Sequence, residues 1–181
     1  GTVYAEPDDG YEDEGNGDEG SEDPDRTEYD AVENEDGTVT FIETYYEDGV
    51  KTGSREETRS TDGLQTVTVW KDADGNVTET SMETMTCNED GDAVKVEIVT
   101  RDGNGTLIME SVTEIHEDGS ETRGDTYYDE DGQLTGSEET TTDDMGTVLE
   151  RVLMDANGNV TERETNSAET DGDGNPVLTN T

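Results

Sequence analysis

The amino-acid sequence predicts an all-β protein: an antiparallel hairpin-repeat array, laid out as a meander or solenoid-like sheet of about 10–11 strands, with an extended acidic N-terminal arm. Two observations support this fold class. Turn dipeptides, mostly Asp-Gly or Asn-Gly, recur every 12 to 16 residues from residue 36 onward. The runs between them are rich in Thr, Val, Tyr and Ile, and apolar residues alternate with polar ones, as at Val94, Val96 and Ile98. Because Asp-Gly and Asn-Gly accept the positive φ that tight hairpin turns need, each run is expected to form one strand.

The composition by itself opposes a folded domain. The chain has 181 residues, a formal net charge of −41 and only 25% hydrophobic residues. Chains with so little apolar surface and so much charge tend to stay unfolded, whereas the strong periodicity indicates a folded repeat. We therefore expect order to depend on cations that neutralise carboxylates, or on neighbouring copies that complete a core. Adaptation to high salt is a further explanation of the charge that stays open.

The chain is expected to divide into two parts. Residues 1–37 are predicted to form a short N-terminal strand followed by an acidic, Gly-rich arm, and residues 38–181 the β-hairpin repeat domain. Gly1–Ala5 is β-prone, and the residues after it are mostly acidic residues and glycine, interrupted by Pro7 and Pro24. Repulsion between like charges extends a segment of this kind, so it is interpreted as a linker.

The repeat domain consists of units of about 27 residues, each one hairpin long. The equivalent turn glycines are spaced by 26, 30, 27 and 26 residues, and they are Gly49, Gly75, Gly105, Gly132 and Gly158. Most of these turns follow one pattern: Asp, two residues, Gly, any residue, an aliphatic residue and Thr. The strand that enters the turn ends in apolar residues, whereas the strand that leaves it is mostly polar. One strand of each hairpin is therefore expected to supply a thin core.

Two of the repeats carry a resemblance to a known family. Residues 128–135, Tyr-Asp-Glu-Asp-Gly-Gln-Leu-Thr, and residues 154–161, Met-Asp-Ala-Asn-Gly-Asn-Val-Thr, resemble the unit of the rearrangement-hotspot, or YD-repeat, family. The resemblance covers about residues 40–180. It implies β-hairpins joined edge to edge in long curled sheets on secreted or surface proteins. Most copies lack the Tyr before the Asp, so only the hairpin architecture is transferred.

Carboxylates gather at the repeated turns, and this pattern indicates Ca²⁺ as a cofactor. Ca²⁺ prefers about six to eight oxygen ligands from carboxylates, amides and carbonyls. An ion shared between neighbouring turns would also relieve the repulsion between them. The candidate metal ligands are Asp72, Asp74, Asn76, Asp102, Asn104, Asp129, Asp131, Asp155, Asn157, Asp171 and Asp173. The other interpretation is that Asp only forms the turn. An EF-hand is not expected, because Val77 and Pro176 stand where its loop requires Gly.

Three acceptor sequences for N-linked glycans lie at the same turns. They begin at Asn76, Asn104 and Asn159, and each is followed by a Thr two residues later. Glycosylation of these residues is one interpretation. The alternative is that the turn consensus creates the pattern, because Asn suits the turn and Thr suits the strand.

Several classes of function are excluded or disfavoured. A chain with net charge −41 lacks the basic surface that nucleic acid requires, and no apolar run is long enough for membrane insertion. Cys87 is the one cysteine and His116 the one histidine, and they are 29 residues apart. The sequence also lacks a nucleophile elbow, a phosphate-binding loop and a zinc-ligand spacing. The sequence therefore predicts a protein that is not an enzyme.

These patterns favour a structural subunit of an extracellular filament, matrix or cell-surface assembly, stabilised by Ca²⁺ and built from other copies of the same chain. The β-prone tip before a long arm suggests that Thr2, Val3 and Tyr4 add as a strand to the sheet of the next subunit. Two alternatives remain open: a monomeric acidic module that binds Ca²⁺ or adheres to a surface, and a fragment of a YD-repeat toxin shell.

Overall fold

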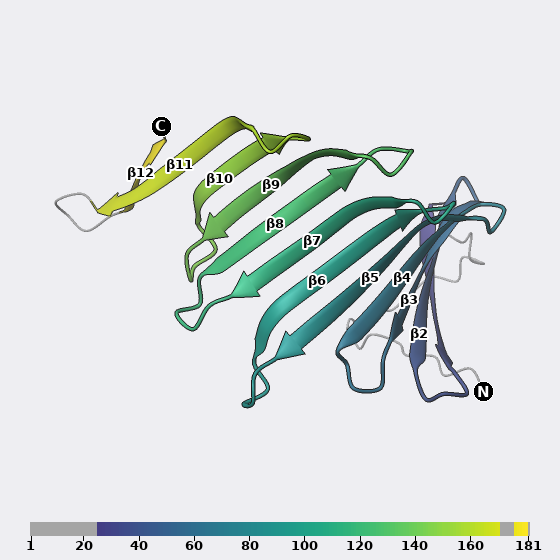
Figure 1. Cartoon of the computed structure of the whole chain (residues 1–181). Coiled ribbons are helices and arrows are strands. Elements are labelled where there is room, and N and C mark those ends of the chain that lie inside the picture. The colour runs from purple at the N-terminus through teal and green to yellow at the C-terminus, as the bar shows by residue number, and fades with distance from the viewer. Residues whose placement is uncertain (1–24, 171–175, 181) are drawn as a thin grey trace, which may run out of the picture. The chain divides into compact units, whose positions relative to one another are not determined.

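The structure is a computed structural model that describes residues 25–170 and 176–180, and it is all β. No helix occurs in these two ranges. The strands are β1 (Arg26–Glu33), β2 (Val39–Glu47), β3 (Val50–Arg59), β4 (Gln65–Asp72), β5 (Val77–Cys87), β6 (Ala93–Asp102), β7 (Leu107–Ile115), β8 (Glu121–Tyr128), β9 (Leu134–Thr142), β10 (Val148–Asp155), β11 (Val160–Thr170) and β12 (Pro176–Asn180). Figure 1 shows them in sequence.

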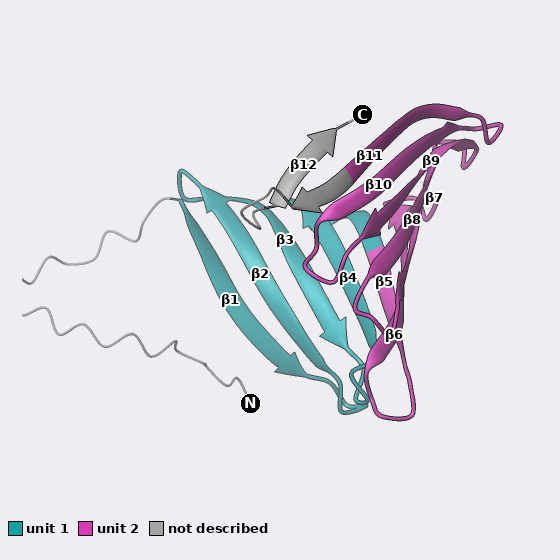
Figure 2. Ribbon diagram, turned by 90° about the vertical axis from the view of Figure 1, so that its left-hand side faces the viewer, with its two compact units in different colours: residues 1–80 teal, residues 81–181 magenta. Residues whose placement is uncertain are grey.

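The strands follow one another in chain order from β1 to β12, each hydrogen-bonded to the next. The pairing is antiparallel, as in β2 with β3, β6 with β7 and β8 with β9. The predicted antiparallel meander of hairpins is thereby confirmed. Two compact units divide the chain, residues 1–80 and residues 81–181, and Figure 2 colours them separately.

The first strand lies inside the range that the sequence analysis gives to the acidic arm. β1 pairs with β2 along its whole length, and Tyr29 lies opposite Glu43 while Ala31 lies opposite Phe41. Its many acidic residues hide the strand pattern in the sequence. The side chains of Glu28, Asp30 and Glu33 are exposed, so their charges cost little free energy in a strand. The sheet therefore begins before residue 38. The predicted contact residues Thr2, Val3 and Tyr4 lie outside the described residues.

The hairpin turns share one geometry. Each described turn has its Gly at a positive φ, between 74° and 92°. In nine turns the Gly N–H donates to the carbonyl three residues earlier, and that earlier residue donates its N–H across the loop. At Asp155 these bonds measure 3.0 Å from Gly158 and 2.9 Å to the Asn159 carbonyl. This is a type I turn closed by a bulged Gly, a common hairpin connection. The Asp-Gly and Asn-Gly signal therefore placed the turns correctly.

The turn between β2 and β3 is the exception. Asp48 and Gly49 both have positive φ, 49° and 76°, and Glu47 pairs directly with Val50. Two successive residues in this region define the two-residue type I′ turn. The Asp48 N–H donates a hydrogen bond outside the turn, to the Asp25 carboxylate at 2.8 Å. This geometry explains why the sequence around Gly49 fits the repeat pattern only loosely.

The thin core that the composition predicts is confirmed. Within the part of the chain that the structure describes, Val152 is the one apolar side chain classed as buried, at 6% exposure. Several other buried side chains are polar: Ser54, Thr68, Thr100, Ser111 and Asp125. Large apolar side chains are exposed instead, such as Tyr29 at 75% and Phe41. Backbone ladders and cross-strand polar pairs thus carry a share of the stability that apolar burial usually supplies.

Candidate functional site

The predicted metal ligands form the turns. The Asp72 carboxylate accepts hydrogen bonds from the N–H groups of Asp74 at 3.0 Å and Asn76 at 2.8 Å. The Asn76 side-chain amide adds a third bond at 2.9 Å. These bonds favour the charged form, so they hold the pKa of the Asp72 carboxyl below its usual value. This carboxylate therefore serves as a cap for the hairpin turn.

The other candidate ligands in the described ranges repeat this arrangement. Asp102, Asp129 and Asp155 each accept backbone N–H bonds from the residues two and four positions later. Asn104, Asp131 and Asn157 are the residues two positions later, and they are exposed at the tips of the loops. Among the described residues no group of three or more His, Cys, Asp or Glu side chains is arranged to hold a metal ion. Asp171 and Asp173 lie outside the described residues.

The three Asn residues of the glycan acceptor sequences also belong to the turns. The side-chain amides of Asn76 and Asn159 donate to Asp72 and Asp155, each at 2.9 Å. Asn104 donates its backbone N–H to Asp102 at 2.9 Å. All three residues are exposed. The turn itself thus gives a structural reason for these Asn residues.

The Thr at the end of the turn pattern has its own role. Thr135 donates its hydroxyl to the carbonyl of Tyr127 at 3.0 Å, and Thr161 does the same to Leu153 at 3.3 Å. In both hairpins the accepting residue lies where the strand register shifts. A register shift leaves a backbone carbonyl without its ladder partner, and the Thr hydroxyl supplies one. The shared Asp, Gly and Thr of the repeats are therefore explained by turn and bulge chemistry.

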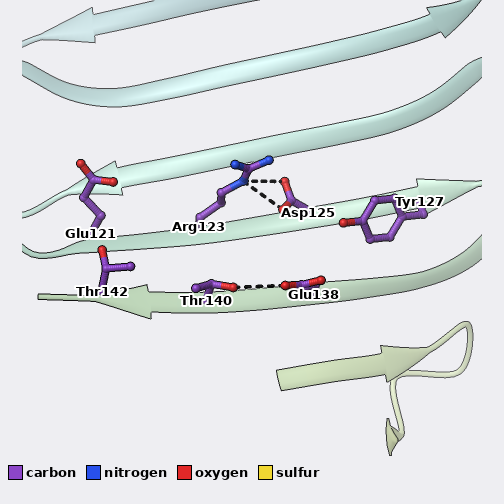
Figure 3. A pocket seen from close by; sticks show the side chains of 7 residues that line it. All are labelled: Glu121, Arg123, Asp125, Tyr127, Glu138, Thr140 and Thr142. Atoms are coloured by element: carbon purple, nitrogen blue, oxygen red, sulfur yellow. Dashed lines mark hydrogen bonds and ion pairs between the residues drawn. The ribbon is translucent and has the colours of Figure 1, made fainter. Parts of the chain in front are cut away.

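A hollow on one face of β8 and β9 was missed by the sequence analysis. It has a volume of about 370 Å³ and is lined by Glu121, Arg123, Asp125, Tyr127, Glu138, Thr140 and Thr142. Figure 3 shows these side chains, which come from alternate positions of the two paired strands. Alternate residues of a strand point to the same face, and paired residues share that face. We call this feature the β8–β9 hollow.

Like charges lie directly opposite each other in the β8–β9 hollow. Asp125 pairs with Glu138 across the two strands, and their side chains are only 10% and 19% exposed. Each carboxylate has its own arginine. The Arg123 Nε lies 2.9 Å from Asp125, and Arg151 on β10 makes two bonds to Glu138, at 2.6 and 3.1 Å. The bond and charge of Arg151 hold the pKa of Glu138 below its usual value.

Two donor groups in the β8–β9 hollow are not engaged by any described residue. Arg123 uses its Nε for Asp125, while its two Nη atoms have no partner within the described part of the chain. The Tyr127 hydroxyl likewise has none there, and the residue is 38% exposed. Burial, and then the negative charges of Asp125 and Glu138, raise the pKa of Tyr127. Tyr127 is therefore a neutral hydrogen-bond donor beside two carboxylates.

A glycine keeps the strands around Tyr127 close together. Gly136 lies opposite Tyr127 in the ladder. A Cβ atom at Gly136 would come within 2.7 Å of the Met154 carbonyl oxygen on β10. Only glycine accommodates such a close approach of backbone without a shift. The pattern Arg123, Asp125, Tyr127 at alternate positions was a sequence signal for this face, but the register with β9 was needed to assemble the hollow.

A related cluster lies on β2 and β3 in the other unit. There Tyr45 is opposite Gly53, and Glu43 is opposite Arg55. Tyr45 donates its hydroxyl to Glu43 at 2.7 Å, while Arg55 contacts both Glu43, at 3.6 Å, and Glu57. The adjoining hollow of about 280 Å³ is lined in part by Tyr29 and Phe41 from β1 and β2. In this cluster the tyrosine hydroxyl and both Arg55 Nη atoms have partners inside the protein.

Comparisons with known proteins give no family assignment. No model of a protein family matches the chain, and no curated protein matches it. In the described ranges there is also no helix with the length and apolar character needed to cross a membrane.

Proposed function

We propose that this chain is a non-enzymatic structural subunit of an extracellular or cell-surface assembly, in which copies of the chain cover each other's sheets. The observation that carries the proposal is that, in the part of the chain that the structure describes, Val152 is the one buried apolar side chain, whereas Tyr29 and Phe41 are exposed. A sheet with so little buried apolar area is marginal alone, and association buries more of it. The partner that covers the sheet is a second copy, because every solution of the protein already contains other copies.

The charge sets the conditions for such an assembly. Copies with a net charge of −41 repel each other at long range. At physiological ionic strength, salt largely screens this repulsion between charges more than about 8 Å apart, and divalent cations neutralise carboxylates directly. Assembly is therefore expected to increase with salt and with Ca²⁺. Ca²⁺ would bind carboxylates at the acidic turn edges and on the arm. It would then promote the association of copies more than it fills a closed site within one copy.

Edge-to-edge addition is the second part of the proposal. β1 pairs with β2 on one side, and no described strand pairs with its other side. An open strand edge offers unpaired N–H and C=O groups to another chain. The β-prone residues Thr2, Val3 and Tyr4 of a neighbouring copy would supply that strand.

The test is the molar mass in solution. Sedimentation velocity should give species heavier than 19.7 kDa that grow with protein concentration, with NaCl and with millimolar CaCl₂. Deleting residues 1–5 should reduce the mass at the same concentration. A single 19.7 kDa species under all these conditions would overturn the proposal.

A monomeric adhesive module is the second candidate function. The observation in its favour is the β8–β9 hollow, where Arg123 and Tyr127 present hydrogen-bond donors that no residue of the described ranges uses. Under this alternative the sheet is a scaffold for a binding face, and the sedimentation experiment gives the monomer mass.

A further inference from the structure

We infer that the β8–β9 hollow is a binding site for a neutral saccharide, held by the guanidinium of Arg123 and the ring of Tyr127. The inference does not depend on assembly, because all lining residues belong to two neighbouring strands of one chain. Its volume of about 370 Å³ reaches the lower end of the range for small-molecule sites, about 300–1,000 Å³.

The donors and acceptors of the hollow suit a ligand that carries many hydroxyl groups. Each hydroxyl both donates and accepts hydrogen bonds. The Nη atoms of Arg123 form a planar fork that can donate to two neighbouring oxygens, and the Tyr127 hydroxyl is a further donor. Glu121 and Thr142, opposite each other at the end of the hollow, offer acceptors. Thr140 contributes a hydroxyl beside Glu138.

The charges of the hollow select against an anion. The lining carries three carboxylates, Glu121, Asp125 and Glu138, and one cation, Arg123, while Arg151 bonds to Glu138 from β10 outside the lining. A phosphate or sulfate group would meet these carboxylates and the field of a chain with net charge −41. An apolar ligand would leave the Arg123 fork desolvated and unpaired. A neutral ligand with polar groups avoids both costs.

A cationic ligand is also disfavoured at this position. The exposed guanidinium of Arg123, with its side chain 52% accessible, lies among the lining residues and would repel a lysine or arginine head group. The carboxylates that would attract a cation, Asp125 and Glu138, already have bonds to arginine. The turn edges, with their exposed Asp residues, are a better surface for cations.

Tyr127 supplies the apolar part of the site. The residue is 38% exposed, and the residue opposite it, Gly136, has no side chain to compete for the space. Aromatic rings offer an apolar body with a polar tip, which suits a ligand that has C–H groups on one face and hydroxyls at its rim. The cluster on β2 and β3 lacks this arrangement, because the Tyr45 hydroxyl and the Arg55 fork are consumed internally.

The experiment is an NMR titration of the full chain with neutral oligosaccharides: maltotriose, cellotriose, chitobiose, lactose and mannobiose. We expect at least one of them to shift the signals of Tyr127 and the Arg123 side chain. Arg123→Lys keeps the charge but removes the planar fork, and Tyr127→Ala removes the ring. Each is expected to weaken binding about tenfold, the effect of about 1.4 kcal/mol.

Tyr29→Ala is the matched control, because Tyr29 is a more exposed tyrosine on the face of the other unit. Unchanged saccharide affinity in this variant supports the assignment. Three results would overturn it: no shift at Tyr127 with any of the five saccharides, equal loss of affinity in Tyr29→Ala, or a response to tetralysine or glucose 6-phosphate alone. None of these results bears on the sedimentation test, so the two proposals fail separately.

Discussion

The β2–β3 and β8–β9 hairpins carry the same kinds of side chain but pair them differently across the two strands. Both place a tyrosine opposite a glycine, Tyr45 with Gly53 and Tyr127 with Gly136. In β2–β3 the next pair on the same face has opposite charges, so the polar groups of this cluster bond to one another. In β8–β9 the next pair is Asp125 with Glu138, and arginines at other positions must neutralise both. The difference shows that a pair of carboxylates in place of an opposite-charge pair leaves hydrogen-bond donors available on an otherwise similar face.

The shared glycines give the largest predicted effect. Gly53→Ala and Gly136→Ala each place a Cβ 2.7 Å from a backbone carbonyl oxygen, of Lys71 and Met154 respectively. The neighbouring strand must move away, so we expect each variant to lose about 1–3 kcal/mol of unfolding free energy. Urea denaturation followed by tryptophan fluorescence or circular dichroism measures this loss.

Gly124→Ala on β8 is the matched control for these variants. A Cβ at Gly124 meets nothing within 4 Å, and its φ is not positive. Alanine there restricts the unfolded chain and is expected to be neutral or stabilising by up to about 1 kcal/mol. A loss in Gly124→Ala equal to that in Gly136→Ala would show that the close carbonyl is not the cause.

The arginine that neutralises Glu138 in the β8–β9 hollow gives the second effect. Arg151→Met leaves Glu138 facing Asp125 without its bidentate partner, so the melting temperature should fall and the pKa of Glu138 should rise. Arg163→Met is the control, because its ion pair with Glu150 is longer, 3.5 Å, and more exposed. Thermal melts should rank Arg151→Met below Arg163→Met, and the reverse ranking contradicts the account.

The turn caps give a smaller effect, which the β2–β3 hairpin lacks because its two-residue turn has no Asp cap. Asp155→Ala removes the acceptor for the N–H groups of Asn157 and Asn159, so the melting temperature should fall. Asp155→Asn keeps an oxygen in the same place and should preserve most of the stability. If the two variants melt at the same temperature, the hydrogen bonds to Asp155 contribute nothing measurable.

The pH dependence of the same cap is the smallest effect. Hydrogen bonds from Asn159 hold the pKa of Asp155 below 3.8 in the folded chain. A depressed carboxyl pKa stabilises the fold above the unfolded value and loses this contribution as the pH falls through the folded value. The melting-temperature advantage of the native chain over Asp155→Asn should therefore shrink below pH 3.8. An advantage that grows on acidification would reverse the sign of this linkage.

The turns and the strand order were predictable because they are local. Asp-Gly and Asn-Gly determine where the chain reverses, and short connections place consecutive strands side by side. The strand β1 was not predicted, since its acidic residues mask the alternation of Thr27, Tyr29 and Ala31. Residues of this kind suit an exposed strand as well as an acidic linker, and composition does not separate the two.

The β8–β9 hollow was not predictable from the sequence. Its assembly depends on the register that sets Asp125 opposite Glu138 and Arg123 opposite Thr140. A shift by one residue would send these side chains to opposite faces. The turn Asp residues, by contrast, were identified from sequence as one of two things, metal ligands or turn formers. The described turns support the second role with hydrogen bonds, while Ca²⁺ binding remains a proposal.

Among the described residues the sheet buries one apolar side chain, Val152, and the central claim is that the sheet depends on other copies for its stability. Amide hydrogen exchange measured over a range of protein concentrations tests it most directly. We predict that protection of the β6–β10 amides, including that of Val152, rises with concentration and with salt, in step with the sedimenting mass. Full protection of these amides in a dilute, metal-free monomer would contradict the claim.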